Sequence, residues 1–337
     1  MPKPACGPRA FHVQALSRRG GGRVTALHAR FTANDDPVRV PRLPPPTAAV
    51  LALASALAAG AAASAESSRI PPHIDGDPRL VAALNARVAL LADHAAVSPG
   101  QRFKAGLRIV HDAGWHTYWA NSGDSGLPTR YDWTLPPGAS AGPIDWPLPE
   151  RLLASGLTNF GYSDALLLPA TITVPAGAQA GERFRATLRA RWLICEEACI
   201  PDEATLSIDL PVETAPRPSK DAEEFRAVAA RVPARPSGLR GHSWRDATHV
   251  ATQIDDAPPM LREAKRIEVF PLTPQIVAST RIDARLGPDG ALRFRHPASE
   301  YFDRMPARVE WVIGAEGEDG RWRALQVALP ADDARAP

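Results

Sequence analysis

The chain has 337 residues, of which 39 are Lys or Arg and 37 are Asp or Glu, so its formal net charge is +2. The first 65 residues hold 8 of the basic and 2 of the acidic side chains, which leaves 31 and 35 for the remainder and a net charge there of about −4. A chain that is acidic beyond its N-terminal segment lacks the basic surface that binds phosphate backbones. The composition therefore argues against nucleic acid as a partner.

Residues 1–65 have the features of a leader with a signal peptide, disordered or cleaved. The run Thr47–Ala63 consists of apolar and small residues and is preceded by Arg39 and Arg42. It ends in Ala63-Ser64-Ala65, which has the small-x-small form that signal peptidases cut. We expect cleavage after Ala65 and export through an internal signal sequence near residues 42–65.

The alternative for this apolar run is a transmembrane helix, but 17 alanine-rich residues are short and weakly hydrophobic for spanning a bilayer. No later segment approaches 18 consecutive apolar residues, so we expect no membrane span in the mature chain. Residues 1–38 then represent an over-extended start or a long leader, and Cys6 is lost with them.

The mature segment is too long for one β-sandwich of roughly 100 residues and suits two. Short alternating apolar runs, each bounded by Gly, Pro or Asp, predict strands in the first region, 66–212. These runs lie at 103–110, 170–174, 184–194 and 205–210. The predicted fold class is all-β, with two immunoglobulin-like β-sandwich domains after the signal peptide.

Residues 213–238 are rich in proline and charge and predict a linker with one short helix, about 220–232. Ser219 is the expected N-cap and Pro233 the expected stop. A second β-sandwich is predicted for 239–332, with strands at 267–270, 276–286, 291–295, 309–313 and 324–329. This region has no cysteine, so we expect a scaffold or docking module.

The mature chain keeps two cysteines, Cys195 and Cys199, four positions apart. In one extended strand they would lie about 13 Å apart, beyond disulfide reach, so residues 196–198 must turn the chain. Alternating residues on both flanks favour a three-residue hairpin loop over a helical turn. Both sulfur atoms would then lie at the end of a sheet, within reach of a partner protein.

A purely structural disulfide is the first alternative. The loop-entropy model gives such a short ring only about 2 kcal/mol of stabilisation, and sandwich domains normally bridge distant strands. Glu196 and Glu197 lie between the two cysteines and should disfavour a thiolate. The pair therefore suits a relay whose disulfide is attacked by a partner thiolate, and these two glutamates are its candidate thiol-modulating residues.

Several spaced motifs follow one another along the first region. They are Gly114-Trp115-His116-Thr117-Tyr118-Trp119-Ala120-Asn121, Gly123-Asp124-Ser125-Gly126-Leu127-Pro128, Asp145-Trp146-Pro147-Leu148-Pro149, Asn159-Phe160-Gly161-Tyr162, Trp192-Leu193-Ile194-Cys195 and Cys199-Ile200-Pro201. In this order they resemble the N-terminal periplasmic domain of the DsbD/ScsB thiol:disulfide interchange proteins, closer to the ScsB-like branch. The resemblance is good over about 85–212 and loose over 213–330.

The resemblance implies a periplasmic thiol–disulfide oxidoreductase of the protein-disulfide reductase type, with Cys195 and Cys199 as its redox pair. It implies no cofactor beyond this disulfide. Its expected partners are a membrane-embedded thiol electron donor and thioredoxin-like periplasmic client proteins. The family's shielding cap would correspond to Asn159, Phe160 and Tyr162. Family members usually continue into a membrane domain and a thioredoxin-like domain, which we expect here on a separate chain unless the gene is truncated.

Two other functions use the same cysteines. One is a copper or zinc site in which His111 or His116 completes the ligand set, although neither histidine has ligand spacing from a cysteine. The other is a non-catalytic adaptor with a structural disulfide.

The segment Gly123-Asp124-Ser125-Gly126 imitates a serine-protease nucleophile loop, but we interpret it as an ordinary turn.

Overall fold

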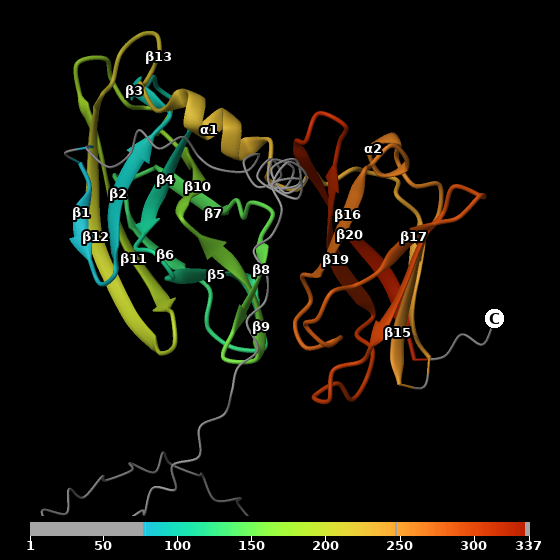
Figure 1. The fold of residues 1–337 in the computed structure, drawn as a ribbon. Coiled ribbons are helices and arrows are strands. Elements are labelled where there is room, and N and C mark those ends of the chain that lie inside the picture. The colour runs from blue at the N-terminus through green and yellow to red at the C-terminus, as the bar shows by residue number, and fades with distance from the viewer. Residues whose placement is uncertain (1–76, 78, 247, 334–337) are drawn as a thin grey trace, which may run out of the picture. The chain divides into compact units, whose positions relative to one another are not determined.

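The structure is a computed structural model that describes residues 77, 79–246 and 248–333, all of which belong to one compact unit, Ala61–Pro337. The predicted signal peptide and Cys6 lie outside the described residues. The fold is all-β, as predicted, with two short helices among the described residues (Figure 1). None of the helices described is long and apolar enough to cross a membrane.

The first region is a sandwich of two mainly antiparallel sheets. One sheet has the order β1-β2-β4-β10-β7, and the other has the order β12-β11-β5-β9-β8, with β6 also paired to β11. The strands of the first sheet are β1 (Val81–Ala83), β2 (Ala86–Ala92), β4 (Arg102–His111), β7 (Ser140–Ile144) and β10 (Ala165–Thr173). Those of the second are β5 (His116–Gly123), β6 (Arg130–Thr134), β8 (Glu150–Ala154), β9 (Leu157–Ser163), β11 (Arg183–Cys195) and β12 (Cys199–Pro211).

Strand β11 illustrates why these residues form a sandwich. Its side chains alternate between buried and more exposed, with Leu188, Trp192 and Ile194 on the buried face. A period of two residues places one face of a strand in the core and the other toward solvent. All four runs predicted in this region lie wholly or largely within strands, here β4, β10, β11 and β12.

Helix α1 (Ala222–Ala229) is shorter than the predicted 220–232, and Ser219 is not its N-cap. The N-cap is Asp221, which makes no side-chain capping bond. The Ser219 hydroxyl instead accepts a hydrogen bond from the Asp221 amide at 3.0 Å and donates one to the Ala92 carbonyl at 2.6 Å. Ser219 therefore ties the turn before the helix to β2. Next to these residues in the sequence, β3 (His94–Ala96) and β13 (Arg217–Pro218) pair with each other as antiparallel strands.

The C-terminal region forms a seven-stranded sheet of order β16-β19-β20-β14-β15-β18-β17, in which β14 and β20 are parallel. Its elements are β14 (Gly241–Asp246), β15 (His249–Ile254), α2 (Pro259–Arg262), β16 (Arg266–Pro271), β17 (Ala284–Leu286), β18 (Leu292–Pro297), β19 (Arg308–Glu316) and β20 (Trp322–Asp332). Four of the five predicted strands coincide with β16, β18, β19 and β20.

The strand predicted over 276–286 is wrong except at its end, where β17 begins at Ala284. The consecutive side chains of Ile276 and Val277 are both buried in the C-terminal core, and Ile282 joins them. In a strand, consecutive side chains point to opposite faces, so two neighbours cannot both point into one core. This apolar segment is accordingly irregular and makes one isolated bridge, Val277 with Ala298.

The division into two domains stays a prediction. The C-terminal region has a core of its own, but Phe270 and Val312 also belong to the buried cluster that contains Trp119 and Phe160 of the sandwich. The ring of Phe270 packs edge-on against both aromatic rings, at centroid distances of 6.1 Å and 5.6 Å.

We predict that Leu188→Ala lowers the free energy of unfolding by about 2–5 kcal/mol, because it leaves a cavity where a fully buried side chain fills the sandwich core. Leu153→Ala is the matched control. Leu153 is 80% exposed, so its loss should change stability by less than about 0.5 kcal/mol. Urea denaturation followed by tryptophan fluorescence measures both, and equal effects would contradict the assigned core.

Candidate functional site

The two cysteines lie at the tip of the hairpin formed by β11 and β12. The strands pair in one uninterrupted register from Arg183 opposite Pro211 to Cys195 opposite Cys199. Residues 196–198 form the connection, so the predicted three-residue loop is confirmed. Cys195 and Cys199 are joined by a disulfide with a Cα–Cα distance of 4.2 Å.

The two halves of the disulfide differ in exposure. Cys195 is 2% exposed, whereas Cys199 is an exposed residue. Directly opposed residues of an antiparallel pair project from the same face, so both cysteines lie on the face opposite to the core residues Trp192 and Ile194. The burial of Cys195 therefore results from covering groups on that face, and Cys199 is the half that a partner can reach.

Tyr118 is the first covering group. Its hydroxyl donates a hydrogen bond to Sγ of Cys195 at 3.0 Å and lies 3.3 Å from Sγ of Cys199. The sulfur atoms of a disulfide carry no hydrogen, so the tyrosine must be the donor. Burial raises the pKa of Tyr118 above its usual value of 10.0, and the nearby Ser125 hydroxyl acts in the opposite direction. The hydroxyl thus keeps its proton at neutral pH.

The segment Gly123–Pro128 packs over Tyr118. A Cβ atom on Gly126 would lie 2.3 Å from the tyrosine ring, and Gly126 has a φ of +87°, so this position accepts only glycine without rearrangement. The Ser122 hydroxyl donates to the Gly126 carbonyl. The segment that imitates a serine-protease loop forms a turn at Asp124 and Ser125, as predicted. The Ser125 hydroxyl donates to Oδ1 of Asn159 at 2.9 Å and not to a histidine base. The sequence interpretation missed this covering role, and the paired glycines were the available signal.

The three predicted cap residues face different sides of β9. Oδ1 of Asn159 accepts hydrogen bonds from both the amide and the hydroxyl of Ser125, so Asn159 holds the segment that covers Tyr118. Phe160 and Tyr162 point into the sandwich core, where the Tyr162 hydroxyl donates to the Pro147 carbonyl at 2.7 Å. Shielding of the disulfide by these residues stays a prediction.

His111 and His116 have different environments. His111 Nδ1 bonds the Asp164 carbonyl at 2.7 Å and Nε2 lies 3.1 Å from the Thr117 hydroxyl, so both ring nitrogens are used within the protein. His116 is the direct strand partner of Cys195, and its Nε2 is buried without a hydrogen-bond partner. In the described part of the chain, no group of three His, Cys, Asp or Glu side chains is arranged to hold a metal ion.

Glu196 and Glu197 are exposed in the hairpin loop. Oε1 of Glu196 approaches Gly114, where an added Cβ would meet it at 2.7 Å. Their effect on the thiols stays a prediction.

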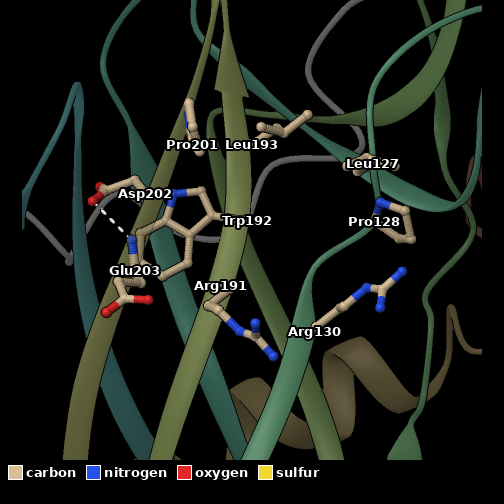
Figure 2. A pocket seen from close by; sticks show the side chains of 9 residues that line it. All are labelled: Leu127, Pro128, Arg130, Arg191, Trp192, Leu193, Pro201, Asp202 and Glu203. Carbon is tan, nitrogen blue, oxygen red and sulfur yellow. Dashed lines mark hydrogen bonds between the residues drawn. The ribbon is translucent and has the colours of Figure 1, made fainter. Parts of the chain in front are cut away.

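An open hollow of about 520 Å³ lies on the same hairpin, close to the disulfide in sequence, and Figure 2 shows the side chains that line it. Leu193 and Pro201, each two positions from a cysteine, contribute its apolar part together with Leu127, which is 57% exposed. The lining is completed by charged and other side chains: Pro128, Arg130, Arg191, Trp192, Asp202 and Glu203. Two of the charges are paired with neighbours, Arg191 with Asp132 and Glu203 with Arg189.

Comparison with known proteins identifies the part of the chain that carries this site. The family model described as "Thiol:disulfide interchange protein DsbD, N-terminal" matches residues 87–211, which span every strand of the sandwich from β2 to β12. Residues 87–211 are thus similar to a DsbD N-terminal domain. The predicted resemblance is thereby confirmed for this segment, and the matched segment contains the whole disulfide hairpin with its covering groups.

Of three solved structures compared with this chain, only the first is similar enough to support the fold. The N-terminal periplasmic domain of ScsB from Proteus mirabilis is 16% identical, with a TM-score of 0.52, and the match covers 73% of this chain and 94% of that one. BcpA, the major pilin subunit of Bacillus cereus, is 9% identical with a TM-score of 0.22, covering 74% and 71%. Spo0M from Bacillus subtilis is 9% identical with a TM-score of 0.21, covering 74% and 91%. No curated protein matches the sequence.

We predict that His111 makes the stability of the protein depend on pH. Burial lowers its pKa from 6.5 to about 4, so between these values the unfolded chain binds more protons and stability falls as the pH is lowered. The total loss is about 3 kcal/mol. Urea midpoints between pH 7 and 4 measure it, and His111→Gln should flatten the slope. An unchanged slope would contradict a buried neutral His111.

We also predict that Gly126→Ala exposes the disulfide, because the added methyl group pushes the covering segment away from Tyr118. Reduction by dithiothreitol should accelerate about tenfold, which corresponds to a decrease of about 1.4 kcal/mol in the free energy needed to expose the disulfide. Gly156→Ala is the matched control, since Gly156 has a similar φ of +79° but no atom within 4 Å of an added Cβ. Equal rates in the two variants would mean that the segment does not cover the disulfide.

Proposed function

We propose that this protein is a periplasmic thiol–disulfide exchange protein that passes reducing equivalents through Cys195 and Cys199. The observation that carries the proposal is a disulfide between two cysteines four positions apart, at the tip of a hairpin. One of the cysteines is exposed and the other is buried, and both lie in the segment that matches the DsbD N-terminal domain. A ring this short contributes only about 2 kcal/mol in the loop-entropy model, so stability alone is a weak reason for the bond.

The unequal exposure of the cysteines supports different roles for them in the exchange. A partner thiolate attacks Sγ of Cys199, the disulfide breaks, and its electron pair stays on Sγ of Cys195. The Tyr118 hydroxyl, already donating to this sulfur, stabilises the thiolate that forms. The partner's second thiolate then attacks its own bridged sulfur and releases Cys199. The partner dithiol is oxidised to a disulfide, and the protein gains two electrons and two protons.

The proposed partners are a membrane-embedded thiol donor on another chain and thioredoxin-like periplasmic clients, which follow from the family. The hollow on the disulfide hairpin supports docking of the chain segment next to a partner's cysteine. Its apolar part, with Leu127, Leu193 and Pro201, continues directly from the cysteines along both strands. Its arginine and carboxylate side chains offer charge contacts at the rim, which favour orientation and encounter rate.

Trapping with single-cysteine variants tests the function. In the Cys195→Ala variant the exposed Cys199 can attack a partner disulfide, and the resulting mixed disulfide cannot be resolved. We predict abundant adducts with this variant on non-reducing gels of host envelopes, and few with Cys199→Ala, which keeps only the buried thiol.

A measurement of reduction potential accompanies the trapping. The Cys195–Cys199 pair should equilibrate with glutathione at a potential less negative than about −300 mV, below which structural disulfides usually lie. Adducts with neither variant, together with a potential below that limit, would overturn the exchange function in favour of a structural disulfide. Adducts mainly with Cys199→Ala would overturn the assignment of the attacked sulfur.

A further inference from the structure

The exchange creates an electrostatic problem at Cys195. When the disulfide breaks, the electron pair stays on a sulfur atom of a residue that is only 2% exposed. Burial disfavours an unpaired thiolate and raises the pKa of its thiol. A thiol with a raised pKa is a slow nucleophile, yet Cys195 must act as the resolving thiolate when the pair is reoxidised.

Tyr118 addresses only part of this problem. Its hydroxyl supplies one hydrogen bond to the sulfur but carries no positive charge. Because burial raises its pKa above 10.0, it also does not exchange its proton near neutral pH. A second group must take up the proton that accompanies reduction.

His116 occupies the position that such a group requires. It is the strand partner of Cys195, and opposed residues of an antiparallel pair have Cβ atoms about 4.5–5.5 Å apart on one face. It also shares this face with Tyr118, two residues along β5, and the two rings meet edge to face at 5.4 Å. Its side chain is 5% exposed, and Nε2 has no hydrogen-bond partner. A buried imidazole nitrogen left unpaired beside a disulfide is costly unless another redox state uses it.

The titratable groups around His116 come from four strands and from the hairpin loop. Tyr118 lies on its own strand and Cys195 on β11. On β9 its strand partner is Ser163, whose hydroxyl donates to Glu150 of β8. His111 at the end of β4 acts electrostatically on the same region, and Glu196 of the hairpin loop lies near Gly114, two residues before His116.

We propose that His116 is the proton acceptor that keeps Cys195 a thiolate after the disulfide is reduced. This inference rests on the proposed exchange function and adds a role that the cysteines and Tyr118 do not fill. In the first step the attacking partner thiol loses its proton, the electron pair moves to Sγ of Cys195, and His116 takes up one proton at Nε2. In the second step Cys199 is released and takes the proton of the partner's second thiol.

The reduced protein then holds a Cys199 thiol and a Cys195 thiolate beside a His116 imidazolium. Two electrons and two protons have been gained in total, so the step is balanced. In the oxidised protein the same imidazole is neutral, because burial lowers the pKa of His116 from 6.5. Reduction should raise this pKa, since an adjacent thiolate favours the charged imidazolium.

The first test follows the histidine in the unaltered protein. NMR titration of the imidazole nitrogens should show that the pKa of His116 is higher by about one unit or more in the dithiol form than in the disulfide form. The imidazole signals of His249, a histidine of β15, serve as an internal control and should be the same in both forms. A pKa of His116 that is equal in the two forms would overturn the proposal.

The second test follows the thiol. In the Cys199→Ala background, the Cβ chemical shift of Cys195 reports its ionisation against pH. Adding His116→Gln should raise the apparent pKa of Cys195 by about one unit or more, through loss of the imidazolium. His249→Gln, which changes a histidine of β15, should leave it unchanged. A smaller shift with His116→Gln, or an equal one with His249→Gln, would overturn the role of His116.

These measurements use no partner protein, so their failure is distinct from failure of the exchange function. Trapped adducts through Cys199 combined with an unshifted Cys195 would leave the exchange standing and remove only His116.

Discussion

The site depends on one constraint, the register of β11 against β12. Because Arg183 opposes Pro211 and the pairing runs without a bulge to the last residue, Cys195 must oppose Cys199 at the tip. A shift by one residue would send one cysteine to the core face and separate the two sulfur atoms. The alternating burial of β11 resists that shift, since Leu188, Trp192 and Ile194 would all leave the core.

The neighbouring strand makes the two sulfur atoms chemically different. Strand β5 meets β11 at a single registered pair, His116 with Cys195, and presents Tyr118 to the disulfide from the same face. The segment Gly123–Pro128 then folds back over Tyr118 and is held there by Asn159 of β9. The result is one cysteine enclosed by hydrogen-bonding and titratable groups and one that remains at the surface.

The opposite face of the same strands connects the site to the C-terminal region. Trp119 and Phe160 alternate with Tyr118 and Asn159, and both pack against Phe270. Arg151 lies 4.3 Å from the Phe270 ring centroid and pairs with Glu268 at 2.5 Å. The amide of Asn121 donates to the Pro271 carbonyl. The strands that cover the disulfide are thus packed on residues far along the chain, which is how the C-terminal region can support the site.

Local pattern and spacing in the sequence determined the all-β fold class, most strands, the hairpin loop and the disulfide pairing, because alternation and ring size act over a few residues. The same local logic failed for 276–286, where two adjacent apolar residues are buried together, and for Ser219, whose partner Ala92 lies 127 positions away. Only the tertiary structure decided which cysteine is buried, that Gly126 rests on Tyr118, and that His116 faces Cys195. These contacts join strands distant in sequence, and no local periodicity records which side chains meet across a sheet.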